Sequence, residues 1–122
     1  MILADSSVWI DHLRKPLAPL ASLLTERRLV MHSFVSGEIA LGSIARRAQV
    51  LGVLTSLDQL EPVPPDVLLD FIEEADLGAK GIGYADAHIL AATHRDQAKL
   101  WTRDKRLAVQ AERLGLAYSP QG

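Results

Sequence analysis

The sequence predicts an α/β fold, a three-layer-like α/β/α sandwich built on a small, mainly parallel sheet. Short apolar runs that suit buried strands alternate with longer segments in which apolar residues recur at helical spacing. Such alternation favours parallel strands joined by helices. The length of 122 residues suits a single domain, residues 1–122, and a hydrophobic content of 48% is enough for a core.

The start of the chain predicts a strand followed by a helix. Residues 1–4 are apolar and suit a short buried strand. Asp5-Ser6-Ser7 comes next, and both residue types are good helix N-caps because their side chains accept hydrogen bonds from free backbone amides. The helix that follows is expected to end at Pro16, because proline cannot continue a helix.

The next segments predict three helices and one strand. Leucines at helical spacing indicate a helix over residues 17–28, and the apolar triplet 29–31 suits a parallel strand. Ser33 is expected to cap a helix over residues 34–44. A further helix is expected over residues 46–57, where apolar residues again form a stripe.

The second half of the chain repeats the alternation. The proline-rich segment 61–65 is a break in which a short edge strand is expected. A helix over residues 66–77 is expected to end with Gly78 as its C-cap. The remaining expected elements are a loop at 79–83, helices at 84–94 and 104–114, and strands at 99–102 and 116–118.

Composition excludes several kinds of protein. No apolar run approaches the length of about 20 residues that a membrane helix needs, so no membrane association is expected. The first residues have no basic region before their apolar stretch, so we expect no signal peptide and a cytoplasmic location. Cys is absent, which excludes disulfides, thiolate metal sites and a Cys nucleophile. The net charge of −2 does not mark a nucleic-acid binder, although balanced charge can hide local basic patches.

Four acidic residues fall where metal-dependent phosphoryl chemistry needs them. Asp5 directly follows the first expected strand and Asp104 follows the strand at 99–102, while Glu38 and Asp86 lie in helices between them. Ligands of open parallel sheets bind at the carboxyl ends of the strands, so these carboxylates can meet in one crevice. Carboxylates without Cys suit a hard cation such as Mg²⁺ or Mn²⁺.

Each acid also has a purely structural interpretation. Asp5 and Asp104 are well placed as helix N-caps, and Asp86 would interact favourably with the amino end of its helix. Glu38 taken alone resembles a surface residue on a polar helix face. Capping and metal binding can coexist at a strand end, so the residues leave both interpretations open.

Other side chains are less informative. Ser6 and Thr102 lie beside strand-end acids, where a hydroxyl can orient a carboxylate or a metal-bound water, although capping would also explain them. The four His residues lack the His-x-x-x-His spacing of a helical metal site and are interpreted as non-catalytic. The sequence contains neither a P-loop nor a Gly-x-Ser-x-Gly elbow.

Four short motifs follow one another along nearly the whole chain. They are Ile2-Leu3-Ala4-Asp5-Ser6-Ser7-Val8-Trp9-Ile10, Glu38 with Gly42, Gly83-Tyr84-Ala85-Asp86-Ala87-His88-Ile89-Leu90-Ala91-Ala92, and Leu100-Trp101-Thr102-Arg103-Asp104-Lys105-Arg106-Leu107. Their types and order resemble the PIN-domain ribonuclease family, and specifically the VapC-type toxins of bacterial toxin–antitoxin pairs. The resemblance implies a PIN-like fold and an endoribonuclease that hydrolyses RNA phosphodiester bonds with Mg²⁺ or Mn²⁺.

The resemblance also implies roles for particular residues and partners. The metal ligands and catalytic residues would be Asp5, Glu38, Asp86 and Asp104, with Ser6 and Thr102 at the family's hydroxyl positions. Arg103 is expected to hold an RNA phosphate, a hypothesis from its position alone. The implied partners are RNA, a cognate antitoxin protein and a second copy of the chain in a homodimer. A leucine-rich groove on the first two helices, with Trp9, Leu13, Leu17, Leu20 and Leu24, is expected to bind the antitoxin.

Two other functions fit parts of the pattern. One is a PIN-fold nuclease of RNA processing that has no antitoxin. The other is a non-catalytic small α/β binding module whose acids only cap helices. A receiver-like domain fits less well, because it needs paired acids near its first strand. A phosphatase with an Asp nucleophile needs a second Asp where Ser7 stands.

Overall fold

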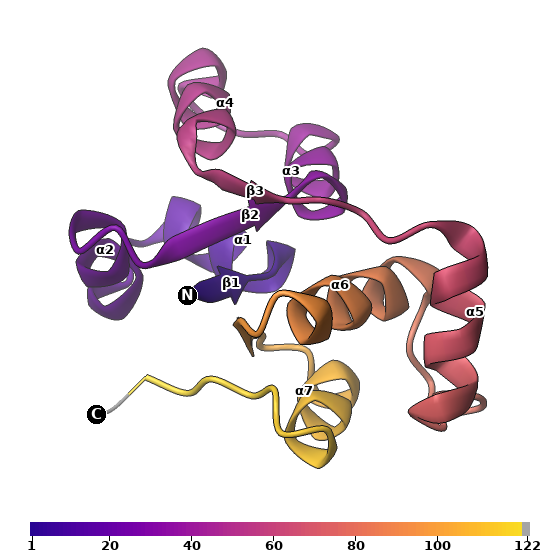
Figure 1. The fold of residues 1–122 in the computed structure, drawn as a ribbon. Helices are drawn as coiled ribbons and strands as arrows, with labels where there is room; N and C mark the ends of the chain where they lie inside the picture. The colour runs from indigo at the N-terminus through magenta and orange to yellow at the C-terminus, as the bar shows by residue number, and fades with distance from the viewer. Residues whose placement is uncertain (121–122) are drawn as a thin grey trace.

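A parallel sheet of four short strands organises residues 1–120, the part of the chain that this computed structural model describes (Figure 1). The sheet has the order β3-β2-β1-β4, and all of its pairings are parallel. The carboxyl ends of the strands therefore share one edge of the sheet. The strands are β1 (Ile2–Ala4), β2 (Leu29–His32), β3 (Asp58–Leu60) and β4 (Lys99–Trp101).

The two inner strands are buried along their whole length. Every residue of β1 and β2 is buried, and Leu3 of β1 pairs with Val30 on one side and Leu100 on the other. Successive residues of a strand point to opposite faces, so unbroken burial means that both faces of the sheet are covered. The predicted α/β fold with a small parallel sheet is confirmed.

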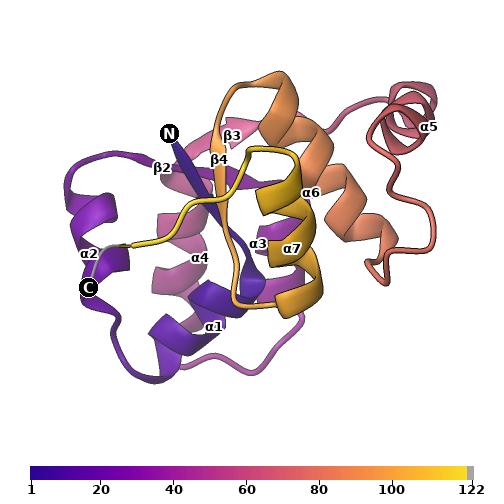
Figure 2. The same cartoon turned by 90° about the horizontal axis from the view of Figure 1, so that it is seen from below.

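Helices follow each strand and complete the two outer layers. α1 packs against β1 and α3, and α6 packs against β4 and α5. Figures 1 and 2 both show α5 at the periphery, with α6 between it and the rest of the chain. The helices within residues 1–120 are α1 (Ser6–Arg14), α2 (Ala18–Thr25), α3 (Ser33–Ala40), α4 (Arg47–Ser56), α5 (Pro65–Glu74), α6 (Tyr84–Arg95) and α7 (Lys105–Arg113).

The core consists of one large apolar cluster and one small one. The large cluster surrounds the sheet, and its fully buried side chains include Leu3, Leu90 and Leu107. The small cluster joins α5 to α6 through Leu68 and Ala91, together with Val63 and Ala87. The main core therefore fixes the strand ends, whereas α5 is held on the outside of α6.

Several expected helix ends were wrong. α2 stops at Thr25, because Arg27 adopts a left-handed backbone (φ 58°) that turns the chain into β2. α3 ends at Ala40 rather than near residue 44, and its N-cap is His32 instead of Ser33. The His32 Nδ1 atom accepts a hydrogen bond from the Phe34 amide at 3.0 Å.

The boundary after α5 was also wrong. α5 ends at Glu74, and Gly78 does not cap it. Instead the left-handed turn falls at Asp76 (φ 52°), and the Arg113 guanidinium donates to the carbonyls of Ala75 and Asp76 at 2.6 and 3.2 Å. The amides of Asp76 and Leu77 donate to carbonyls in the last turn of α5, and Arg113 adds bonds to the two carbonyls that follow the helix.

The expected outer strands lie near their predicted places with altered extent. The edge strand β3 precedes the proline-rich break at 61–65 instead of lying within it. The last expected strand, 116–118, is reduced to a single parallel bridge between Ala117 and Leu100. Hydrogen bonds from Leu100 to Leu116 and from Tyr118 to Leu100 still hold this segment against β4.

Candidate active site

The carboxyl edge of the sheet collects the strand-end residues that the sequence singled out. Asp5 follows β1 directly, and Thr102 follows β4. Their side chains meet, since the Thr102 hydroxyl donates to Asp5 Oδ2 although the two residues are 97 positions apart in the chain. The parallel pairing of β1 with β4 brings them together, with Ala4 opposite Trp101 at the ends of the two strands.

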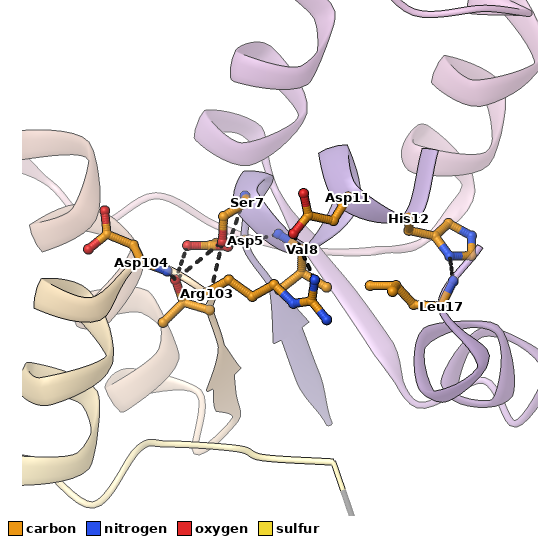
Figure 3. A network of polar contacts seen from close by, with 9 residues as sticks. Asp5, Ser7, Val8, Asp11, His12, Leu17, Arg103 and Asp104 are labelled. Carbon is orange, nitrogen blue, oxygen red and sulfur yellow. Dashed lines mark hydrogen bonds and ion pairs between the residues drawn. The ribbon is translucent and has the colours of Figure 1, made fainter. Parts of the chain in front are cut away.

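Asp5 is buried and fully engaged by hydrogen-bond donors. It is only 5% exposed, and its Oδ1 atom accepts from the hydroxyl and the amide of Ser7 and from the Val8 amide (Figure 3). It is therefore the N-cap of α1, as one interpretation of the sequence expected. Burial raises the pKa of Asp5, and these hydrogen bonds together with that from Thr102 oppose the rise.

Two hydroxyls beside Asp5 also hold the loop after β4. Ser7 Oγ accepts a hydrogen bond from the Arg103 amide at 2.9 Å, and Thr102 Oγ1 accepts one from the Asp104 amide at 3.0 Å. Each hydroxyl therefore donates to Asp5 and accepts from the loop. This arrangement fixes Asp104 relative to Asp5.

Ser7 is the residue in this network that the sequence analysis missed. Ser6 was the expected hydroxyl, but its hydrogen bond is with Glu38, whose pKa it lowers. Neighbouring helix residues point about 100° apart, which follows from 3.6 residues per turn, so only one of the two serines can face back to Asp5. A side chain two residues after an N-cap is a signal that could have indicated Ser7.

Asp104 and Asp86 each stand at the amino end of a helix. Asp104 is the N-cap of α7 and accepts from the Leu107 amide at 3.0 Å. Asp86 lies in the first turn of α6 and accepts from the Gly83 amide at 3.2 Å. Burial raises the pKa of Asp86, the Gly83 hydrogen bond lowers it, and the charge of Asp104 raises it. Asp86 and Asp104 are therefore close enough to repel one another.

Glu38 differs from the other three acids because it caps no helix. It lies in the second half of α3, after Val35, which is buried, and beside Ile39, which is buried too. Burial raises the pKa of Glu38, and the charges of Asp86 and Asp5 raise it further. Glu38 thus lies near both Asp5 at the end of β1 and Asp86 at the start of α6.

The four carboxylates share one electrostatic neighbourhood without forming a closed metal cage. Among residues 1–120, no three acidic or histidine side chains converge closely enough to make a ready-formed metal site. Mutual repulsion of uncompensated carboxylates favours such separation. The donor set nevertheless fits Mg²⁺ or Mn²⁺, because all four donors are carboxylates and three have raised pKa values that a nearby cation would lower.

Arg103 forms an ion pair with Asp11 and not with its neighbour Asp104. Its Nη1 atom forms an ion pair with Asp11 Oδ2 at 2.8 Å. Figure 3 shows the side chain running along α1 towards Asp11 and away from Asp104. The expected contact of Arg103 with a phosphate stays a prediction, and it would require the arginine to leave or share Asp11.

Two histidines near the site are buried among aromatic rings. His32 is fully buried and His88 is 5% exposed, and both rings contact Phe34 edge-on. Within the described residues, His32 Nε2 and His88 Nδ1 have no hydrogen-bond partner. Burial lowers the pKa of His32 to about 4, with smaller contributions from the positive charges of His88 and Arg95. Burial lowers the pKa of His88 as well, so the surroundings of both rings favour the neutral form.

The expected leucine-rich groove is only partly present. Trp9 and Leu20 are in the core, being 3% and 0% exposed, so they cannot line a groove on the first two helices. An apolar pocket of about 350 Å³ lies instead between α1 and the segment after α3. Its walls include Ile10 and Leu13 of α1 and Ile44 beyond α3.

None of the helices in residues 1–120 has both the length and the apolar character that crossing a membrane requires.

Comparison with known proteins places this geometry in a family. The PIN domain model matches residues 2–113. The chain is 40% identical over 122 residues to Ribonuclease VapC32 of Mycobacterium tuberculosis in two strains, a match that covers 99% of this chain and 98% of that protein.

Solved structures share the fold at much lower sequence identity. The crystal structure of PAE2754 from Pyrobaculum aerophilum superposes with a TM-score of 0.65 at 21% identity, covering 93% of this chain and 90% of that one. The crystal structure of FitAcB from Neisseria gonorrhoeae gives a TM-score of 0.63 at 18% identity, covering 92% and 94%. The fold, the family model and the long alignment with VapC32 agree, and the chain therefore belongs to the PIN-domain family.

Proposed function

We propose that this protein is a Mg²⁺- or Mn²⁺-dependent endoribonuclease that acts as the toxin of a toxin–antitoxin pair. The function of its relative supports this proposal, because Ribonuclease VapC32 is 40% identical over nearly the full length of both chains. Asp5, Glu38, Asp86 and Asp104 are the proposed metal ligands. When bound there, the ion supplies a Lewis acid for phosphodiester hydrolysis.

Glu38 is the observation that carries the proposal. Asp5, Asp86 and Asp104 each accept hydrogen bonds from amides at the amino ends of helices, so capping alone would explain their positions. Glu38 has no such structural task, yet it stays next to two other acids that raise its pKa. Glu38 is exposed, so water screens this repulsion and keeps its cost small, but a bound cation would replace the repulsion with attraction.

The residues around the acids have supporting roles in this proposal. Ser7 and Thr102 hold the carboxylate of Asp5 and fix the loop that carries Asp104. Ser6 acts on Glu38. Hydrogen bonds from these hydroxyls hold the carboxylates in one orientation.

The binding-module alternative is favoured by one specific observation, which is that three of the four acids do cap helices. Cleavage of total cellular RNA by the purified protein separates the two functions. We expect discrete fragments with Mg²⁺ or Mn²⁺, none with EDTA, and none from Asp5→Asn. Asp70→Asn is the matched control, because Asp70 is an exposed acid of the peripheral helix α5. Absence of metal-dependent cleavage by folded protein would favour the binding module.

An antitoxin is the proposed protein partner, and a homodimer is the proposed assembly. The apolar pocket between α1 and the segment after α3 suits an apolar side of an amphipathic antitoxin helix. Ile10 and Leu13 offer that contact from one helix face, three residues apart. Leu13→Asp should weaken antitoxin binding while leaving RNA cleavage intact, whereas Leu69→Asp on exposed α5 should change neither.

A further inference from the structure

Arg106 lies on the rim of the acidic site and reaches across to another segment. It belongs to the first turn of α7, two residues after Asp104. Its side chain covers Gly81, because a methyl group placed on Gly81 would stand 3.1 Å from Arg106 Cδ and 3.3 Å from Nη1. Gly81 is two residues before Gly83, whose amide donates a hydrogen bond to Asp86. The guanidinium therefore joins the segment that carries Asp104 to the segment that carries Asp86.

Gly81 leaves space for the Arg106 side chain, and any other residue at this position would obstruct that space. Its backbone is left-handed (φ 78°), a conformation that glycine adopts without steric cost. A side chain there would be strained and would also press on the guanidinium at the distances given above. The bare backbone of Gly81 therefore leaves room for the Arg106 side chain to lie against it.

The charge of Arg106 has no acidic partner within the described chain. Arg28, Arg95 and Arg103 each form an ion pair with a carboxylate, whereas Arg106 makes neither an ion pair nor a hydrogen bond to residues 1–120. It is also exposed. A guanidinium that is both positioned and available suits a phosphate, which it can bind through two parallel hydrogen bonds.

We propose that Arg106 binds a phosphate of the RNA and positions the strand over the four acids, an inference that rests on the proposed ribonuclease function. The acids repel a phosphate backbone, and the positive charge of Arg106 near them would offset that repulsion. Arg106 is better placed for this task than Arg103, whose guanidinium is already paired with Asp11. Arg106 acts as a positioning residue, and the acids remain the catalytic groups.

The salt dependence of RNA binding tests this role. The probe is a fluorescein-labelled oligouridylate, and binding is followed by anisotropy across a range of salt in an Asp5→Asn background that does not cleave it. Each phosphate contact to a single strand contributes about 0.7 to the slope of log affinity against log salt. Arg106→Ala should lower the slope by roughly this amount. Arg28→Ala is the control, because Arg28 precedes β2 and lies at the opposite edge of the sheet.

Two further measurements separate a positioned arginine from a general effect of charge. In cleavage assays with total RNA, Arg106→Ala should raise KM about tenfold with little change in kcat, as loss of one charged hydrogen-bonding contact predicts. Lys105→Ala removes the neighbouring charge and should have a clearly smaller effect. Gly81→Ala should weaken RNA binding when Arg106 is present and have no further effect on binding in an Arg106→Ala background.

The outcomes distinguish this inference from the proposed function. If the unsubstituted chain neither cleaves RNA nor binds the probe, the ribonuclease function itself is overturned. If binding and cleavage are intact but Arg106→Ala matches Arg28→Ala in slope and KM, the role of Arg106 is overturned. Equal losses in Arg106→Ala and Lys105→Ala would also overturn it, because they would indicate a general effect of positive charge. Circular dichroism of each variant establishes that it is folded.

Discussion

Replacing Thr102 by valine should show how strongly the site depends on one hydroxyl. The substitution removes the donor to Asp5 Oδ2 and the acceptor of the Asp104 amide, while the shape of the side chain is nearly kept. A hydrogen bond to a charged group contributes about 1.5–3 kcal/mol. Asp5 is only 5% exposed, so water cannot fully replace the lost donor. We expect the free energy of unfolding to fall by about 2 kcal/mol, which lowers Tm by roughly 8 °C in a domain of this size.

Thr102→Val should also alter the pH dependence of RNA cleavage. The Thr102 hydroxyl lowers the pKa of Asp5 against the effect of burial, so its loss raises that pKa further. Asp5 must be ionised to bind a cation, and the acidic limb of the pH–rate profile should therefore move to higher pH. Urea unfolding measures the first effect, and RNA cleavage as a function of pH measures the second.

The control for Thr102→Val is Thr55→Val. Thr55 is exposed on α4, and its hydroxyl donates only to carbonyls of its own helix, Leu51 at 3.0 Å and Gly52 at 3.2 Å. Its substitution should change stability by less than about 0.5 kcal/mol. If Thr102→Val is as stable as the control and its acidic limb does not move, the argument that this hydroxyl holds Asp5 is refuted.

Three further predictions concern pH, charge and assembly. The pKa of His32 is lowered to about 4 from 6.5, so the unfolded chain binds the proton first as pH falls. The contribution of neutral His32 to stability is present above pH 6.5 and is lost as pH falls towards 4, by roughly 3 kcal/mol in total. Over this range the urea midpoint of the unsubstituted chain should fall further than that of His32→Gln, and an equal fall would contradict the prediction. Glu38→Gln should abolish metal-dependent RNA cleavage yet leave stability unchanged or slightly higher, because it removes the solvent-screened repulsion from Asp86 and Asp5. A less stable variant in urea would indicate a structural role. Sedimentation should give the mass of two 13.3-kDa chains, and a monomer at every concentration would disprove the homodimer.

The strands could be predicted from sequence because burial on both faces leaves a simple mark. Residues 1–4 and 29–31 are unbroken apolar runs, and they became β1 and most of β2. The helix ends could not be predicted in the same way. They depend on left-handed backbone at Arg27 and Asp76, where no glycine marks the turn in the sequence.

The acids of the candidate site could be selected from sequence, but their contacts could not. Asp5 and Asp104 follow strands, and parallel topology dictates that strand ends share one edge. By contrast, Arg103 pairs with Asp11 across 92 positions of the chain, and no local pattern indicates such a pair. The choice of Ser6 in place of Ser7 as the partner of Asp5 has a similar cause, since it depends on which helix face meets Thr102.

The pairing of the first strand with the last has a consequence for synthesis of the protein. β1 leaves the ribosome first, but one of its two neighbours in the sheet is β4, which begins at Lys99. The hydrogen bond from Thr102 to Asp5 likewise cannot form until 97 further residues have been made. Contacts of such long sequence separation form late in folding. The nascent chain therefore remains without an assembled acidic site until translation is nearly complete.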